Sequence, residues 1–278
     1  MSSDNKFDVI FHWGELTSWL GQDWRKHFKH GTEDVLLPRG SVKSFESYQA
    51  ALRAKYPPKP NSKGIVTWNP ISSAIKDKGW NGEGIRIGAI GFSQTCIGLA
   101  TLLESKDAGA LDFVFACDGI HRIWPSWKSF AKLAAFGTSG NPNIAPTDHC
   151  LVITHSETSS GSPTIPSTKQ TATEIAMHVM AEPVFTDFVD IPELKDAEHA
   201  PISTTCNYAP HEKYVYKKVP GDYNTKVGNF YVFGYKNLAK TCNDHIYQSK
   251  VIGPRVLQHI LLPRWNNNPR TGGKCVVI

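Results

Sequence analysis

One stretch, Gly84 to Lys106, constrains the fold of this chain more than any other, because its apolar pattern changes period half-way along. Residues 84–90 form a short run rich in isoleucine, which is typical of a buried parallel strand. From Cys96 onward the apolar residues recur at the spacing of one helix face. The stretch therefore predicts a strand that passes directly into a helix, as in an α/β protein.

Five residues, GFSQT, join that strand to that helix. A turn this tight needs small residues two positions before and after its apex, and Gly91 and Thr95 occupy those positions around Ser93. This pattern predicts a nucleophile elbow, which holds a serine hydroxyl at the C-terminal edge of a sheet. The backbone N–H of Gln94 would then lie at a helix N-terminus, where it can stabilise an oxyanion. The alternative interpretation is that Ser93 only caps the helix.

Composition narrows the class of protein. The chain has 278 residues, enough for one large α/β domain, and 40% of them are hydrophobic, as in a folded protein. The net charge is +5 with Lys and Arg spread along the chain, so we expect no nucleic-acid partner. No apolar run is long enough to span a membrane, and the N-terminus lacks a signal-peptide pattern, which predicts a cytoplasmic protein.

Cysteine spacing bears on cofactors. The six cysteines are scattered without metal-ligand spacing, so we expect reduced thiols, no metal and no other cofactor.

Apolar patterns place further elements along the chain. Beyond the elbow, we expect helices over residues 45–55, 71–78 and 168–180 and strands over residues 7–11, 34–37, 112–117, 150–154 and 228–235. The first of these strands ends in HWGE, where the N–H of Gly14 could supply a second oxyanion-hole donor. The alternative is a turn that simply requires a glycine.

Acidic residues follow two of the predicted strands. Asp118 directly follows the strand over 112–117, in the sequence DGIH, and Glu157 lies beyond the strand over 150–154. The carboxyl ends of parallel strands meet at one edge of a sheet, which is also the edge of Ser93. We prefer Asp118 as a triad acid because a glycine turn can present it, and Glu157 is the alternative. Asp118 could also be no more than a cap.

A histidine lies between the last predicted strand and the last predicted helix. The helix is expected over residues 246–262, and His245 precedes it in a loop. A histidine in this position can act as the general base for a serine nucleophile.

The succession HWGE, GFSQT, DGIH, THSET and NDHIYQ at strand ends resembles the α/β-hydrolase superfamily, and Ser93, acid, His245 is the chain order of that superfamily. The THSE loop, the DGIH turn and the closing LLPRW are similar to a sparsely characterised group of microbial and phage-type hydrolases. The resemblance covers residues 8–265. The sequence departs from the superfamily pattern at Thr95, where the elbow usually has glycine, and in HWGE, which is not a clean His-Gly motif.

The resemblance implies an α/β-hydrolase fold, with a mostly parallel central sheet and helices on both faces. It also implies a serine hydrolase that cleaves an ester, thioester or amide through an acyl-enzyme. The triad would be Ser93, Asp118 and His245, and the oxyanion hole Gln94 and Gly14. Two other functions are compatible with the sequence, namely an acyltransferase using the same triad and a non-catalytic binding protein on a hydrolase scaffold.

Domain organisation is expected to be simple. Residues 1–265 would form one domain, in which the proline-containing segment 183–222 is a possible lid or insertion, and residues 266–278 would form a flexible tail. The chain ends in CVVI, the pattern of a prenylation site at Cys275. One prenyl group would give weak, reversible membrane attachment. The alternative is a chance match.

Overall fold

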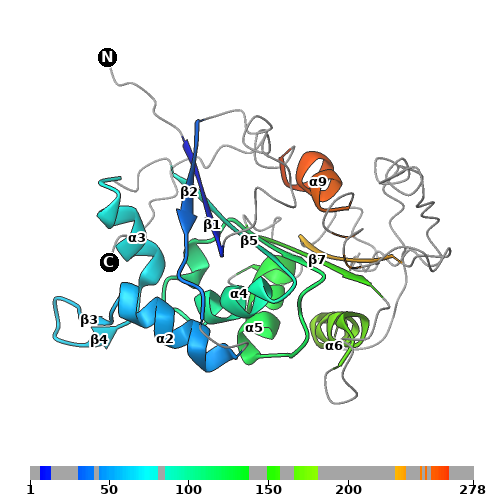
Figure 1. Ribbon diagram of the computed structural model, residues 1–278, viewed down its shortest axis with the longest axis horizontal. Helices are drawn as coiled ribbons and strands as arrows, with labels where there is room; N and C mark the ends of the chain where they lie inside the picture. Colours follow the sequence, from blue (N-terminus) through cyan, green and yellow to red (C-terminus); the bar gives the residue numbers. More distant parts are fainter. Residues whose placement is uncertain are drawn as a thin grey trace.

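The computed structural model describes residues 7–13, 31–40, 44–80, 85–137, 149–156, 166–180, 229–235, His245, Gln248 and residues 252–262. Within these residues, six strands form one sheet, and every neighbouring pair is parallel (Figure 1). The strand order is β2 (Gly31–Leu36), β1 (Phe7–His12), β5 (Arg86–Phe92), β6 (Phe113–Cys117), β7 (Cys150–Ser156) and β8 (Phe230–Tyr235).

The central strands are buried along almost their whole length. Every residue of β6 and β7 is buried, as is every residue of β5 except the last. A parallel strand covered on both faces has no solvent side, so its sequence is a continuous apolar run and does not alternate. Burial on both faces therefore explains the continuous apolar runs from which these strands were predicted.

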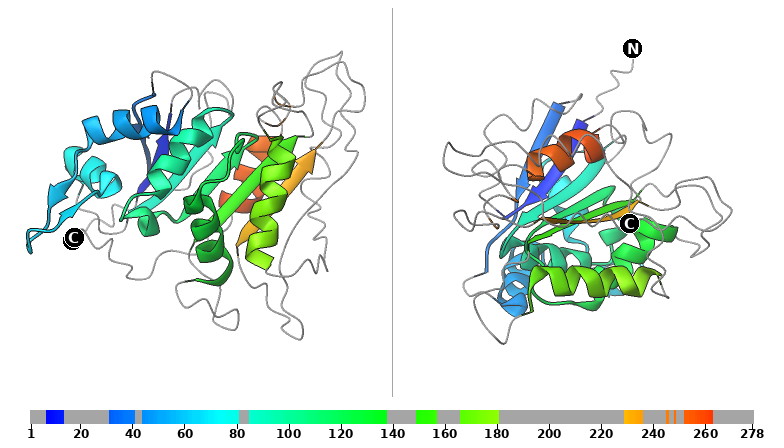
Figure 2. Two further views of the ribbon diagram at one scale, coloured as in Figure 1. Left: turned by 90° about the horizontal axis from the view of Figure 1, so that it is seen from below. Right: turned by 90° about the vertical axis from the view of Figure 1, so that its right-hand side faces the viewer.

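Helices cover both faces of the sheet (Figure 2). On one face lie α2 (Phe45–Lys55), α4 (Thr95–Leu103), α5 (Pro125–Phe136) and α6 (Thr168–Met180). The opposite face carries α9 (Gly253–Val256), which continues into a π-helical turn, η4 (Leu257–Leu261). The α/β architecture with a parallel sheet and helices is as predicted from the sequence.

Shorter elements complete the described fold. Helix α3 (Pro70–Asp77) precedes β5, and a two-stranded antiparallel hairpin joins β3 (Lys59–Pro60) to β4 (Val66–Thr67). A short 3₁₀ helix, η2 (Ala108–Ala110), follows α4. None of the helices in the described ranges combines the length and apolar character that a membrane span requires.

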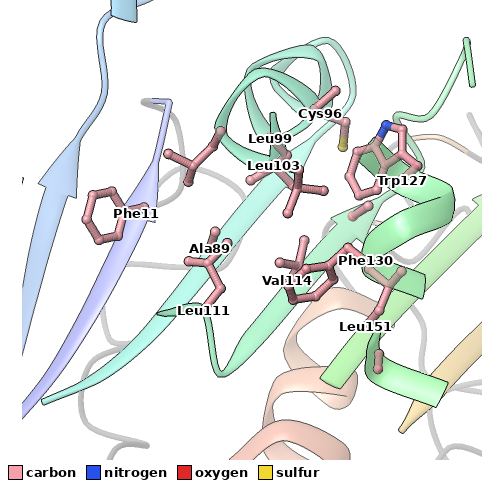
Figure 3. Packing of buried hydrophobic residues seen from close by; sticks show 14 of the residues in the cluster. Phe11, Ala89, Cys96, Leu99, Leu103, Leu111, Val114, Trp127, Phe130 and Leu151 are labelled. Carbon is pink, nitrogen blue, oxygen red and sulfur yellow. The ribbon is translucent and has the colours of Figure 1, made fainter. Parts of the chain in front are cut away.

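The core lies between the sheet and helices α4 and α5 (Figure 3). Leu99 and Leu103 of α4 and Trp127 of α5 belong to the same buried cluster as Ala89 and Val114 of the central strands. This packing anchors α4 on the sheet and so fixes the turn that precedes it.

Helix α4 also packs closely against the end of β1. The indole of Trp13 is buried, and its Nε1–H donates to the carbonyl of Pro38 at 3.0 Å. A Cβ added at Gly98 would lie 2.3 Å from that indole. The close approach of α4 to Trp13 therefore depends on glycine at this helix position.

We expect Gly98→Ala to lower the free energy of unfolding by about 2 kcal/mol, because overpacking against Trp13 outweighs the better helix propensity of alanine. Urea unfolding followed by tryptophan fluorescence measures the change. Gly109→Ala is the control, since no heavy atom lies within 4 Å of a Cβ there. A Gly98→Ala protein as stable as wild type would contradict the packing described here.

Candidate active site

The turn between β5 and α4 holds its central residue in a strained conformation. Strand β5 ends at Phe92 and α4 begins at Thr95, so Ser93 and Gln94 form the turn. Ser93 has a φ of +54°, which an L-residue with a side chain rarely adopts. Its N–H donates to the carbonyl of Cys117 at 3.0 Å, which ties the turn to the end of β6.

The two flanking positions meet the spatial demands of this turn in different ways. A Cβ at Gly91 would lie 2.8 Å from Cδ1 of Leu99, so that position has no room for a side chain. Thr95 is accommodated, because its hydroxyl accepts from the N–H of Phe92 and donates to the carbonyl of Phe92, both at 2.7 Å. A threonine whose polar group is satisfied within the turn thus takes the place of the second glycine.

Gln94 occupies the N-cap position of α4, with φ −53° and ψ −27°. Backbone N–H groups in the first turn of a helix have no partner within that helix and lie at the positive end of its dipole. The side chain of Gln94 is directed at Tyr48, because its Nε2 donates to the hydroxyl of this buried residue at 3.4 Å. The turn therefore presents a helix N-terminus beside Ser93.

Asp118 lies next to this turn because the strands are in register. Phe92 of β5 pairs with Cys117 of β6, so the residues that follow them, Ser93 and Asp118, leave the sheet at the same edge. Asp118 also has a positive φ, +41°. In the described ranges, the non-glycine residues with positive φ are Ser93 and Asp118. A Cβ at Gly119 would lie 2.1 Å from the carbonyl oxygen of Ser93, so the two strained turns touch.

The carboxylate of Asp118 is 1% exposed and accepts four hydrogen bonds. Oδ1 accepts from the N–H of Ser156 at 2.7 Å and from the hydroxyl of Thr168 at 2.6 Å. Oδ2 accepts from the hydroxyl of Ser156 and from Nδ1 of His245, both at 2.7 Å. Because an ionised carboxylate can only accept, Nδ1 of His245 must carry the proton.

Opposing effects act on the ionisation of Asp118. Burial is the largest and raises the pKa, but the hydrogen bond from His245, the charge of that imidazole, and the hydrogen bonds from Thr168 and Ser156 together outweigh it. The pKa of Asp118 therefore lies below its ordinary value, and the group remains a carboxylate at neutral pH.

His245 lies over the turn that carries Ser93. Its ring stacks on the ring of Phe92, the residue before Ser93, with 4.4 Å between centroids and 24° between planes. Its side chain is 26% exposed, so the imidazole reaches from the buried carboxylate to the surface. The structure makes His245 helical, whereas the sequence predicted a loop at this residue. The structure thus brings three features together, namely the turn that contains Ser93, the carboxylate of Asp118 and the imidazole of His245.

A second histidine, His121, stands beside this pair. Burial lowers its pKa, and the charge of His245 lowers it further, whereas Asp118 and a hydrogen bond with the backbone of Pro166 raise it. At neutral pH the group is therefore uncharged, and it does not compete with His245 for the negative charge of Asp118.

Sequence reasoning missed two residues of the site, Ser156 and Thr168. Strand β7 continues to Ser156, two residues beyond the predicted end, and this extension places the Ser156 N–H and hydroxyl against Asp118. Thr168 is the first residue of α6. The one local signal was a serine and a threonine beside predicted element ends, which is also the pattern of ordinary caps.

Several predicted features lie outside the described residues: Gly14, Glu157, the segment 183–222, the tail 266–278 and Cys275. Their roles stay predictions. Cys96 and Cys117 are buried free thiols, and Cys150 is also buried. The described ranges contain no group of three or more His, Cys, Asp or Glu side chains that could hold a metal ion.

Comparisons with known proteins give little independent guidance. No family model matches the chain, and no curated protein matches it. Among solved structures, the crystal structure of the metagenomic carboxyl esterase MGS0156 is similar with a TM-score of 0.35 and 11% identity, over 95% of this chain and 77% of that chain.

We expect Ser93→Gly to be more stable than Ser93→Ala by about 1 kcal/mol, although both variants lose the hydroxyl. Glycine adopts the positive φ at no steric cost. The stability gained in this way exceeds the stability lost because glycine has greater conformational entropy in the unfolded chain. Differential scanning calorimetry of the two variants measures the difference. An alanine variant at least as stable as the glycine variant would show that the turn is not strained.

The lowered pKa of Asp118 predicts an acid-dependent loss of stability. The carboxylate stabilises the fold above its unfolded pKa of about 3.9, and this contribution disappears as the pH falls through the lower folded value. The free energy of unfolding, from urea titrations at several acidic pH values, should therefore fall more steeply below about pH 4 in wild type than in Asp118→Asn.

Asp107 provides a control of opposite sign, because burial raises its pKa. Its ionisation destabilises the fold, so replacing it by Asn should remove a loss of stability that occurs as the pH rises through about 4. Equal slopes in wild type and Asp118→Asn would contradict the assignment of a stabilised carboxylate.

Proposed function

We propose that this protein is a serine hydrolase with an α/β-hydrolase fold, which cleaves an ester, thioester or amide through an acyl-enzyme. One observation carries the proposal. The buried carboxylate of Asp118 accepts a hydrogen bond from Nδ1 of His245, and the same imidazole stacks on the residue that precedes Ser93. A carboxylate that orients a histidine beside a serine is the arrangement that serine nucleophiles use on unrelated folds.

Backbone strain favours a catalytic protein over a non-catalytic binding protein on the same scaffold. The two non-glycine residues with positive φ in the described ranges are Ser93 and Asp118, the proposed nucleophile and the proposed acid. Strained residues cost about 1–3 kcal/mol each and are concentrated at sites where the conformation serves a function.

In the proposed reaction, the Ser93 hydroxyl attacks the substrate carbonyl carbon while Nε2 of His245 takes the hydroxyl proton. Asp118 stays anionic and stabilises the resulting imidazolium through Nδ1. The N–H groups of Gln94 and Gly14 hold the oxyanion, at roughly 3 kcal/mol for each donor.

The imidazolium then protonates the leaving group, and the acyl group remains on Ser93. Water, deprotonated by the same imidazole, attacks the acyl-enzyme and releases the acid. This reaction sequence requires no cofactor.

Labelling by a fluorophosphonate probe tests the proposal. We expect wild type to label, Ser93→Ala not to label, and His245→Ala and Asp118→Asn to label more slowly by roughly 10³-fold or more, because the general base or its orientation is lost. Glu157→Gln should label like wild type. The measurement is the second-order rate constant of labelling on folded protein.

Ser73→Ala, on helix α3, is the matched control for loss of a serine hydroxyl. Folded wild-type protein that never labels would leave the binding-protein interpretation. Slow labelling of Glu157→Gln together with normal labelling of Asp118→Asn would move the acid to Glu157.

A further inference from the structure

We propose that Ser156 and Thr168 are positioning residues, which hold the carboxylate of Asp118 in the plane and direction that His245 requires. The kinetic part of this inference rests on the proposed function. The structural part rests on the hydrogen bonds alone.

Ser156 and Thr168 supply three of the four donors to the carboxylate of Asp118. The four donor–acceptor distances are 2.6 Å and three times 2.7 Å, which is the short range of charge-assisted hydrogen bonds. The side chains of both residues are buried, each 2% exposed. Water has little access, so the protein itself must satisfy the carboxylate on both oxygens.

These donors come from outside the turn that contains Asp118. Ser156 ends β7, whereas Thr168 begins α6, and the Thr168 hydroxyl oxygen also lies 3.2 Å from the carbonyl oxygen of Ser156. One turn further along α6, the hydroxyl of Thr171 donates to the carbonyl of Ile120. The start of α6 is thus bonded to the segment after β6 at two points, of which one is the carboxylate.

The donors also determine how much negative charge faces His245. Each O–H or N–H directed at the carboxylate draws charge away from Oδ2. Among the described residues, His121 and the thiols of Cys96 and Cys117 also interact electrostatically with Asp118. Burial lowers the pKa of His121 and raises the pKa values of the two thiols, so all three groups are uncharged at neutral pH. Removing the Thr168 hydroxyl should leave more charge on the oxygen that bonds Nδ1, and this charge favours imidazolium over imidazole.

A positioning role changes the pH dependence of labelling, which a purely structural role would leave unchanged. In Thr168→Val, the acid limb of the labelling rate against pH should move upward by about half a unit, because the histidine must lose its proton to act as a base. The plateau rate should fall roughly tenfold, since the carboxylate can rotate away from the imidazole. Thr168→Ser should restore both, because it keeps the hydroxyl.

Thr171→Val is the matched control. It lies one turn further along the same helix and loses a hydroxyl of the same type, but that hydroxyl bonds the carbonyl of Ile120 and not the carboxylate. Its acid limb should coincide with that of wild type. If Thr168→Val does not fold, Ser156→Ala takes its place, since it removes the donor to Oδ2 and keeps the backbone N–H.

A second measurement does not depend on activity. Proton NMR detects the downfield resonance of an imidazole N–H bonded to a carboxylate, which here is assigned by its loss in His245→Ala. We expect this resonance to shift or broaden in Thr168→Val and to persist unchanged in Thr168→Ser and Thr171→Val.

An unchanged resonance in Thr168→Val, or an acid limb that moves equally in Thr168→Val and Thr171→Val, would overturn the inference. If wild type fails to react with the probe while the resonance depends on Thr168, the proposed function fails and the positioning role stands.

Discussion

The hydrogen bond between Asp118 and His245 is the interaction on which the arrangement of this protein depends. It joins two positions 127 residues apart, and it places a negative charge where water has almost no access. An unpaired charge in such a place costs several kcal/mol, so the fold must bring donors to it from several directions. The end of β7, the start of α6 and the side chain of His245 all meet at this carboxylate.

The same edge of the sheet concentrates backbone strain that the rest of the fold supports. The turns of Ser93 and Asp118 touch through Gly119, and each turn is bonded to the neighbouring strand, at Cys117 and at Thr154 respectively. Below them lies the packed layer of α4 and α5 on buried strands. Because this layer is closely packed, it resists rearrangement. The unfavourable φ values of Ser93 and Asp118 therefore persist, whereas a more loosely packed protein would relax them.

Most of the fold and part of the site could be predicted from the sequence, for identifiable physical reasons. Helices α2 and α6 have the predicted bounds, and α2 has a local start signal because Ser44 accepts a hydrogen bond from the N–H of Ser47. Strand β2 begins three residues before its predicted start at position 34, because pairing with β1 and not apolar character defines its polar first half.

The contacts of Ser156 and Thr168 with Asp118 span 38 and 50 residues, and no local pattern encodes them. The position of Asp118 at the same sheet edge as Ser93, in contrast, follows from a rule about strand ends that needs no knowledge of distant partners. Thr95 shows how a written motif can understate what a turn permits: the requirement is a small volume with its polar atom satisfied in place, and threonine meets it. A sequence motif that requires glycine at this position misses chains that form a physically equivalent turn. More sequences can therefore form this turn than such a motif identifies.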